Sequence, residues 1–409
     1  MQSHLDALMT DRNLDAVVVG GKTAGNPPLI YLLNGAHVTQ ALLIKKRGAA
    51  PQLIVSPIER EEAVAAGYPV ILNTRYNYGG LLKEHGGDVL AASVAYQAAI
   101  FDDLGVTGRV GFYGYRDQGN AYAFLKALDA ALPAVEIVGE MEPTLIEAAR
   151  ATKDAAEVAR IREVGRRTAE VVRQTVAFLQ GHAVDADETL RHATENRALT
   201  VGDAHAHIHQ LIIQQGLDDA EGFIFAAGRD AGVPHNHGTP DMPLRLGETI
   251  IFDIYPREPG GYFFDMTRTF CLGYAPDVAM RLYRDVADCV VHLKAVLQAG
   301  EETRSYQRMA CAFYETRGHP TIGSDPATLE GYVHGLGHGV GLDIHEAPSF
   351  FDYAGNTARL TPGHVFTLEP GLYYPDQGMG CRIEDTLWLN ERGEVCNLTD
   401  YPYDLVVPM

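Results

Sequence analysis

The chain has 409 residues, a length that predicts two domains rather than one compact core. Its composition, 46% apolar and 21% charged, is that of a soluble globular protein, and no uninterrupted apolar run of about 18 residues indicates a membrane span. The net charge of −20 argues against a nucleic-acid partner, because binding to phosphates requires a basic surface.

The N-terminus and the cysteines indicate where the protein resides. Residues 1–5 contain neither the basic region nor the apolar core of a secretory leader. The five cysteines form no CxxC pair and are odd in number, which favours reduced thiols over a disulfide framework. We therefore expect a cytoplasmic protein.

Residues 1–145 are predicted to form an α/β domain. Short apolar runs and a helical pattern alternate along this segment, as expected for layered strands and helices. The predicted strands are residues 16–19, 41–44, 53–55 and 135–138, and the predicted helix is residues 121–132.

A long amphipathic helix over residues 154–180 opens the second domain, which is predicted to comprise residues 153–409. Asp154 can cap this helix with Glu157 at capping-box spacing, and Gly181 can end it.

The rest of the second domain mixes strands, tight turns and two further helices. These helices are predicted at about residues 277–298 and 303–317. Because strands and helices do not alternate strictly after residue 202, the pattern predicts an α+β domain.

Two acidic residues interrupt apolar strands of the second domain. Asp253 lies in residues 249–255 and Asp265 in residues 263–270, and a turn between them predicts a β-hairpin. A carboxylate inside an apolar strand is costly unless it is paired or binds metal. On paired strands the two acids can face the same side. The alternative is that each acid points to solvent from an edge strand.

Three further ligand candidates follow along the chain. His338 lies in a glycine-rich stretch, Glu369 ends an apolar strand, and Glu384 interrupts another. With the two aspartates they form an oxygen-rich set with one imidazole, which favours Mn²⁺, with Co²⁺, Zn²⁺ or Mg²⁺ as alternatives. Bridging carboxylates would hold two such ions roughly 3.5–4 Å apart, a spacing that activates a shared water.

The order of these residues resembles the M24 or "pita-bread" metallopeptidase family, which includes prolidase, aminopeptidase P, methionine aminopeptidase and creatinase. The matching stretches, which span nearly all of residues 155–409, are Phe252–Asp253, Asp265–Thr269, His334–Gly339 with His345–Glu346, Glu369–Gly371 and Arg382–Asp385. The N-terminal domain is similar to one that prolidase, aminopeptidase P and creatinase carry and methionine aminopeptidase lacks. The resemblance implies a creatinase-like α/β domain followed by a pita-bread catalytic domain.

The resemblance also implies which residues hold metal. The family's ligands correspond to Asp253, Asp265, His338, Glu369 and Glu384, and retention of the whole set favours a metal hydrolase over a creatinase-type protein. The interval between the two aspartates is one residue longer than is usual in the family, which we interpret as a wider turn at residues 259–261.

The family's mechanism implies roles for further residues. Glu369 would pass a proton from the attacking water to the proline nitrogen, and His345 would steady the tetrahedral intermediate. His235 would contact the prolyl side of the substrate, although His237 is an alternative. His334 would line the pocket. Arg382 would orient a ligand carboxylate, or would form only a structural ion pair.

Not every histidine need be functional, since a histidine in a turn is usually an ordinary polar residue. His205, His207 and His209 alternate as on a strand, and we expect them on the surface or in a second wall around the site, with a contribution to the floor of the site as the alternative.

The predicted function is metal-dependent hydrolysis of the Xaa-Pro bond, in dipeptides or at the N-termini of peptides, by a homodimer. One alternative keeps the fold and the metals but acts on a non-peptide small molecule. Another is a non-catalytic pita-bread binding module, against which the ordered ligand set argues.

Overall fold

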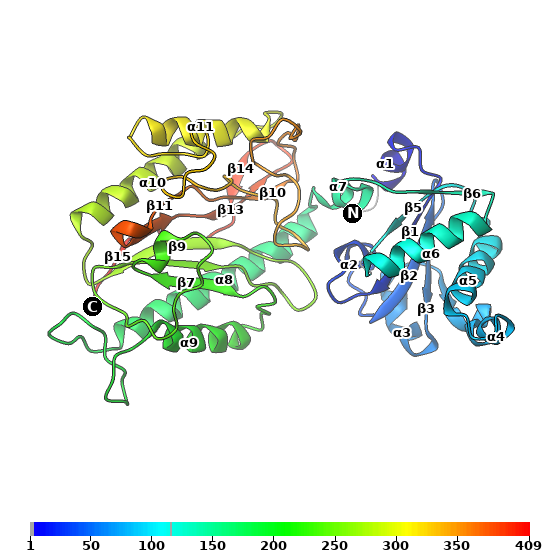
Figure 1. Cartoon of the computed structure of the whole chain (residues 1–409), viewed down its shortest axis with the longest axis horizontal. Helices are drawn as coiled ribbons and strands as arrows, with labels where there is room; N and C mark the ends of the chain where they lie inside the picture. Colours follow the sequence, from blue (N-terminus) through cyan, green and yellow to red (C-terminus); the bar gives the residue numbers. More distant parts are fainter. Residues whose placement is uncertain (1–3, 115–116) are drawn as a thin grey trace. The chain divides into compact units, whose positions relative to one another are not determined.

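The computed structural model describes residues 4–114 and 117–409, which form two compact units, Met1–Arg150 and Ala151–Met409 (Figure 1). Residues 1–3, part of the segment that argued against a secretory leader, lie outside the described residues. Within the described ranges, no helix is both long and apolar enough to cross a membrane.

The N-terminal unit is built on a six-stranded sheet with the order β4-β3-β2-β1-β5-β6. Strand β2 is antiparallel to both of its neighbours, whereas the other pairs are parallel. The strands are β1 (Ala16–Lys22), β2 (Gln40–Lys46), β3 (Gln52–Val55), β4 (Val70–Leu72), β5 (Gly108–Tyr113) and β6 (Val135–Val138). The helices are α1 (Leu5–Asp11), α2 (Pro27–Leu32), α3 (Arg60–Ala63), α4 (Tyr78–Glu84), α5 (Val89–Leu104), α6 (Gln118–Ala131) and α7 (Leu145–Arg150).

The predicted long helix opens the C-terminal unit as α8 (Ala155–Gln180). Asp154 accepts hydrogen bonds from the first turn, Glu157 completes the capping box, and Gly181 is the C-cap. Helices α9 (Val201–Gln214), α10 (Asp277–Val296) and α11 (Thr303–Glu315) follow. Figure 1 shows α10 and α11 over one side of the strands of this unit and α8 and α9 along the other.

Three small sheets lie between these helices, with the orders β15-β9-β8-β7, β10-β13-β14 and β11-β12. Their strands are β7 (Phe223–Ala227), β8 (Thr249–Ile254), β9 (Met266–Leu272), β10 (Val365–Leu368), β11 (Gly371–Tyr374), β12 (Met379–Arg382), β13 (Asp385–Leu389), β14 (Val395–Asn397) and β15 (Val406–Val407). Strands β7 to β9 are buried along their whole length.

The strand predicted for His205, His207 and His209 is wrong, because these residues lie on helix α9. A capping box between Thr200 and Asp203 starts the helix, and its buried residues recur at helical spacing. His205 and His209, one turn apart, both contact the Phe223 ring, whereas the His207 ring stacks on another aromatic side chain. Histidines at every second position resemble a strand pattern, but the N-terminal capping box and the length of the segment indicate a helix.

Candidate metal centre

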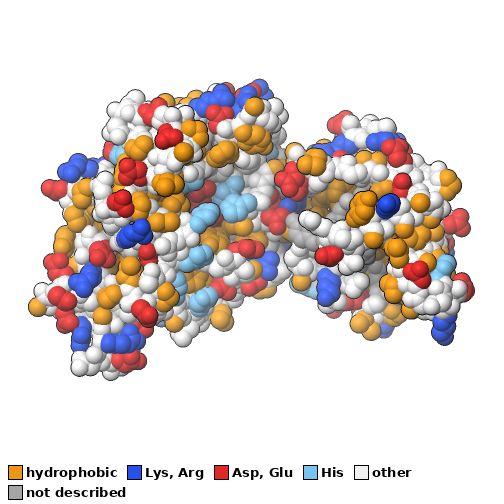
Figure 2. All heavy atoms as spheres, in the orientation of Figure 1, with side chains coloured by type: hydrophobic (Ala, Val, Ile, Leu, Met, Phe, Trp, Pro, Cys, Tyr) orange, Lys and Arg blue, Asp and Glu red, His pale blue; other side chains and the backbone are white. Residues whose placement is uncertain are grey.

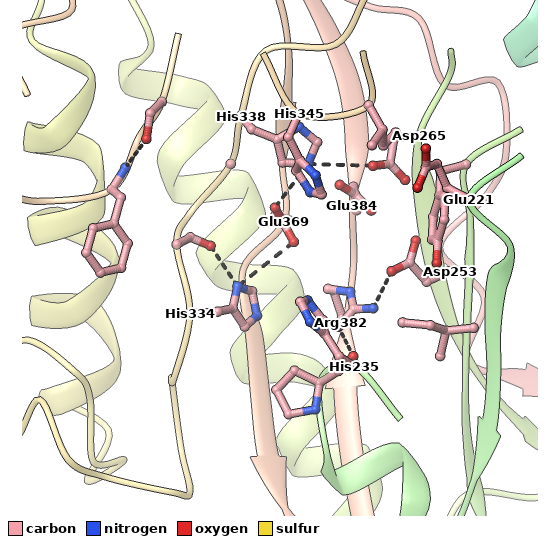
Figure 3. Close-up of a pocket in the computed structure, with 18 of the residues that line it drawn as sticks. Glu221, His235, Asp253, Asp265, His334, His338, His345, Glu369, Arg382 and Glu384 are labelled. Atoms are coloured by element: carbon pink, nitrogen blue, oxygen red, sulfur yellow. Dashed lines mark hydrogen bonds and ion pairs between the residues drawn. The ribbon is translucent and has the colours of Figure 1, made fainter. Parts of the chain in front are cut away.

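All of the site residues predicted from the sequence line one cavity of about 450 Å³ in the C-terminal unit. They are Asp253, Asp265, His338, Glu369 and Glu384 as candidate ligands, with His235, His334, His345 and Arg382 around them. Figure 2 shows histidine side chains gathered in a hollow on the visible face of this unit, and Figure 3 shows the labelled side chains converging.

The β8–β9 hairpin places its two acids on one face. Asp253 pairs with Thr267 across the ladder, and Asp265 lies two residues before Thr267. Asp265 is the residue just before strand β9, and its side chain lines the same cavity as that of Asp253. One oxygen of each aspartate is buried without a hydrogen-bond partner, an arrangement that is costly unless a cation is bound there.

His338 presents one ring nitrogen to these acids. The Cβ of an alanine at Gly337 would lie 2.2 Å from the Thr367 carbonyl oxygen, so glycine is required where the His338 loop passes strand β10. The ring's Nδ1 donates to the Gly339 carbonyl at 3.1 Å, which leaves the lone pair on Nε2. That nitrogen lies 3.6 Å from Oδ2 of Asp265 and 3.6 Å from Oε1 of Glu369. A backbone carbonyl that accepts from the other ring nitrogen, and so fixes the tautomer, is typical of a metal-binding histidine.

The two glutamates come from the ends of strands. Glu369 follows β10, and Glu384 lies between β12 and β13. Oε2 of Glu384 accepts a hydrogen bond of 2.8 Å from Thr267, while its Oε1 is buried without a partner. Ligand atoms of Asp265, His338 and Glu384 all lie within 4.8 Å of one another.

Burial and mutual repulsion shift the protonation of these groups. Burial raises the pKa of Asp265 and that of Glu384 well above their ordinary values, and repulsion from the neighbouring carboxylates adds to both shifts. Burial also raises the pKa of Glu369 to about 8. Burial lowers the pKa of His338 to about 3, which keeps its imidazole neutral. Crowded carboxylates beside a neutral imidazole fit divalent cations, whose charge would offset the repulsion.

Arg382 joins the candidate ligands to the wall of the cavity. Its guanidinium pairs with Asp253, while its Nε donates to Thr267 Oγ1 at 3.1 Å. Since Thr267 in turn donates to Glu384, the arginine supports two candidate ligands, one directly and one through a hydroxyl. Its Nη1 also donates to the Tyr373 hydroxyl at 2.7 Å.

The other histidines form the wall and the rim of the cavity. His334 is held at both nitrogens, by the Gly335 carbonyl at 2.7 Å and the Tyr373 hydroxyl at 2.8 Å. The His345 ring lies 4.2 Å from the His338 ring, measured between centroids. Both His235 and His237 line the cavity, but Nδ1 of His237 is bonded to the Phe223 carbonyl at 2.8 Å.

The comparisons with known proteins agree with this geometry. Residues 159–391, more than half of the chain, match the model of metallopeptidase family M24. The chain belongs to this family. Among curated relatives, a probable dipeptidase PepE of Mycobacterium tuberculosis is 33% identical over 208 residues, which is 51% of this chain and 52% of the relative. A Xaa-Pro dipeptidase of Pyrococcus furiosus is 29% identical over 42% of this chain and 45% of the relative. The matches thus span about half the length of these relatives.

Solved structures of similar proteins extend the likeness in fold over nearly the whole chain. A Xaa-Pro dipeptidase from Bacillus anthracis has a TM-score of 0.75, 20% identity and 98% coverage of both chains. An X-Pro aminopeptidase from Thermotoga maritima has a TM-score of 0.73, 20% identity and coverage of 97% of this chain and 99% of the other. The predicted two-domain architecture, an N-terminal α/β domain and a pita-bread domain, is confirmed.

Three polar residues of the cavity were not predicted from the sequence, namely Glu221, Tyr255 and Ser349. Tyr255 lies two residues after Asp253, so the alternation of strand β8 could have revealed that it faces the same side. Glu221 lies at the rim, just before strand β7. The sequence offers no signal for Glu221, because only the pairing of β7 with β8 brings it to the site.

Metal removal is expected to make stability fall as the pH rises from 6.5 to 8. Glu369 has a folded pKa near 8 against 4.5 ordinarily, so the unfolded chain loses this proton first and gains relative stability as the pH rises. The loss over this window is about 2 kcal/mol for Glu369 alone. The lowered pKa of His338 costs stability only below about pH 6.5, where unfolded histidine becomes charged. Thermal melts of metal-free protein would show the fall, and Glu369→Gln would make it shallower, while Asp265 and Glu384, whose pKa values are also raised, would keep part of it. A melting temperature independent of pH across this window would contradict the prediction.

Proposed function

We propose that the protein is a dinuclear metal-dependent hydrolase of the Xaa-Pro peptide bond. The observation that carries the proposal is the set of buried, unpartnered carboxylate oxygens of Asp253, Asp265 and Glu384. The neutral Nε2 of His338 faces the same space. Named relatives among the M24 proteins, Xaa-Pro dipeptidases and an X-Pro aminopeptidase, support this choice of bond.

The metal would be held by the five candidate ligands, Asp253, Asp265, His338, Glu369 and Glu384. Bound divalent ions supply a water of lowered pKa and polarise the scissile carbonyl. Manganese is the proposed metal, because carboxylates with a single imidazole suit it.

The remaining steps fall to the protein's own groups. Glu369 accepts a proton from the attacking water at a carboxylate oxygen and delivers it to the proline nitrogen, which must be protonated to leave as a secondary amine. His345, at the rim beside His338, donates a hydrogen bond to the developing oxyanion. His235 contacts the prolyl side, since the ring of His237 is already bonded to the Phe223 carbonyl.

His334 and Arg382 position the other groups. His334 is fixed at both of its nitrogens, and its Nδ1 lies 3.9 Å from Oε2 of Glu369, so it restricts where that carboxylate can move. Arg382 holds Asp253.

Location and assembly are proposed with the same activity. All five cysteines are free thiols, which supports a reducing cytoplasm. A homodimer is proposed from the resemblance to two-domain M24 proteins, and sedimentation of the purified chain would test it.

The activity is tested by chelating the metals, adding back Mn²⁺ and following hydrolysis of peptides with proline in the second position. We expect release of the N-terminal residue only after Mn²⁺ is restored, and no cleavage of matched peptides with alanine in place of proline. If the Mn²⁺-loaded protein binds metal and cleaves none of the proline peptides, the proposed function is wrong.

A further inference from the structure

The cavity carries little positive charge of its own. Its lining contains the carboxylates of Glu221, Asp253, Asp265, Glu369 and Glu384. Among the described residues that line it, Arg382 is the only arginine, and there is no lysine.

Arg382 is not available to a substrate. Its Nη2 pairs with Asp253, its Nη1 donates to the Tyr373 hydroxyl and to the Pro234 carbonyl at 3.3 Å, and its Nε donates to Thr267. All three nitrogens are thus occupied, and the side chain is only 3% exposed. Figure 3 shows the guanidinium against Asp253.

The other groups of the lining offer hydrogen bonds or apolar contact rather than charge. Both ring nitrogens of His334 are already bonded, to the Gly335 carbonyl and the Tyr373 hydroxyl, and His338 is a candidate metal ligand whose Nδ1 is bonded to the Gly339 carbonyl. The exposed rim includes His235, Ser349 and Phe351.

We propose that this pocket selects peptides in which the carbonyl of proline is part of an amide bond, and that it disfavours free Xaa-Pro dipeptides. This inference rests on the proposed function and names its substrate class. A dipeptide carries its own α-carboxylate on the prolyl residue, next to the bond that is cut. Tripeptides, longer peptides and prolyl amides present a neutral carbonyl at that position, which needs only a hydrogen-bond donor such as an imidazole.

The charge balance of the metal-loaded pocket also disfavours a substrate with a carboxylate on its prolyl residue. Two divalent cations together with Arg382 would only neutralise the five carboxylates of the lining. No positive surplus remains for a sixth carboxylate, whose burial without a partner is costly. The similar structures bear both names, Xaa-Pro dipeptidase and X-Pro aminopeptidase, so the fold alone does not decide between the two substrate classes.

Three substrates separate the effect of the prolyl carboxylate's charge from that of substrate size. They are Ala-Pro, its amide Ala-Pro-NH₂, and Ala-Pro-Ala. A carboxamide has nearly the size of a carboxylate, so the first pair differs chiefly in charge. With the Mn²⁺-loaded full chain, we expect kcat/KM for the amide and the tripeptide to exceed that for Ala-Pro at least roughly tenfold. The difference should lie mainly in KM, because the cost is that of placing an unpartnered carboxylate in the pocket.

A gain-of-function variant provides a second test. Ser349 lines the cavity with an exposed side chain, while its backbone carbonyl is anchored by Thr303 and Asn356. Ser349→Arg adds a cation at the rim and should raise kcat/KM for Ala-Pro relative to Ala-Pro-NH₂ about tenfold. Ser349→Gln adds a long neutral side chain and should leave this ratio as in the wild type.

The outcomes separate the two proposals. Equal or faster cleavage of Ala-Pro by the wild type would overturn the substrate preference while leaving the Xaa-Pro activity in place. If Ser349→Arg and Ser349→Gln shift the ratio equally, charge is not the cause and the inference fails. If none of the three peptides is cut, the proposed function fails and the preference fails with it.

Discussion

Replacing Glu384 with glutamine is expected to lower kcat/KM on the order of 1,000-fold or more and to reduce Mn²⁺ binding below two equivalents. Glutamine keeps the size of the side chain and can accept the hydrogen bond from Thr267 that Glu384 now accepts. It removes one negative charge and one anionic ligand oxygen from the metal centre. Equilibrium dialysis with Mn²⁺, together with kinetics on a proline peptide, measures both effects.

The metal-free form of the same variant is expected to be more stable than metal-free wild type at pH 8. Burial and the neighbouring carboxylates raise the pKa of Glu384, so ionising it in the fold is unfavourable, and glutamine removes that cost. Loss of metal with a gain in melting temperature distinguishes a ligand from a residue needed only for folding. Glu391→Gln, on an exposed side chain of the same unit, is the matched control. A variant that keeps two equivalents of Mn²⁺ would show that Glu384 is not a ligand.

The sequence predicts the elements and the residues of this site because both depend on local patterns. The capping box at Asp154 and the acids in apolar segments are visible without a structure. The cap starts helix α8 and Asp253 lies in strand β8, as predicted, whereas Asp265 lies just before strand β9 instead of within it. The order of the five candidate ligands along the chain also resembles that of the M24 family, and no single motif would support this resemblance.

Contacts between distant segments could not be predicted in the same way. The sequence suggests that Arg382 assists a nearby carboxylate, but its partner is Asp253, 129 residues away. Glu221 reaches the cavity only because β7 pairs with β8, and β7 was not predicted. The histidines of α9 show a different kind of error. Their alternation along the sequence indicated a strand, although the segment forms a helix.

Arg268 is one residue whose importance only the structure reveals. It is fully buried on strand β9, and its guanidinium donates to the carbonyls of Glu384, Tyr401 and Pro402 at 2.7 to 2.9 Å. It also pairs with buried Asp385 at 2.8 Å. Burial alone would raise the pKa of Asp385, but Arg268 and Lys294 hold it below its ordinary value, so the carboxylate is ionised.

Replacing Arg268 with methionine is therefore expected to destabilise the C-terminal unit by about 3–5 kcal/mol, because it leaves the charge of Asp385 partly uncompensated and several carbonyls unpaired. Metal affinity should fall as well, since Arg268 holds the backbone of the candidate ligand Glu384. Thermal melts with and without Mn²⁺ would measure both effects, and Arg281→Met on the exposed side of α10 is the control. Arg268→Lys keeps the charge but cannot reach the same carbonyls, so it should recover only part of the loss. Full recovery by lysine would mean that the charge of Arg268, rather than its hydrogen bonds, stabilises the segment that carries Glu384.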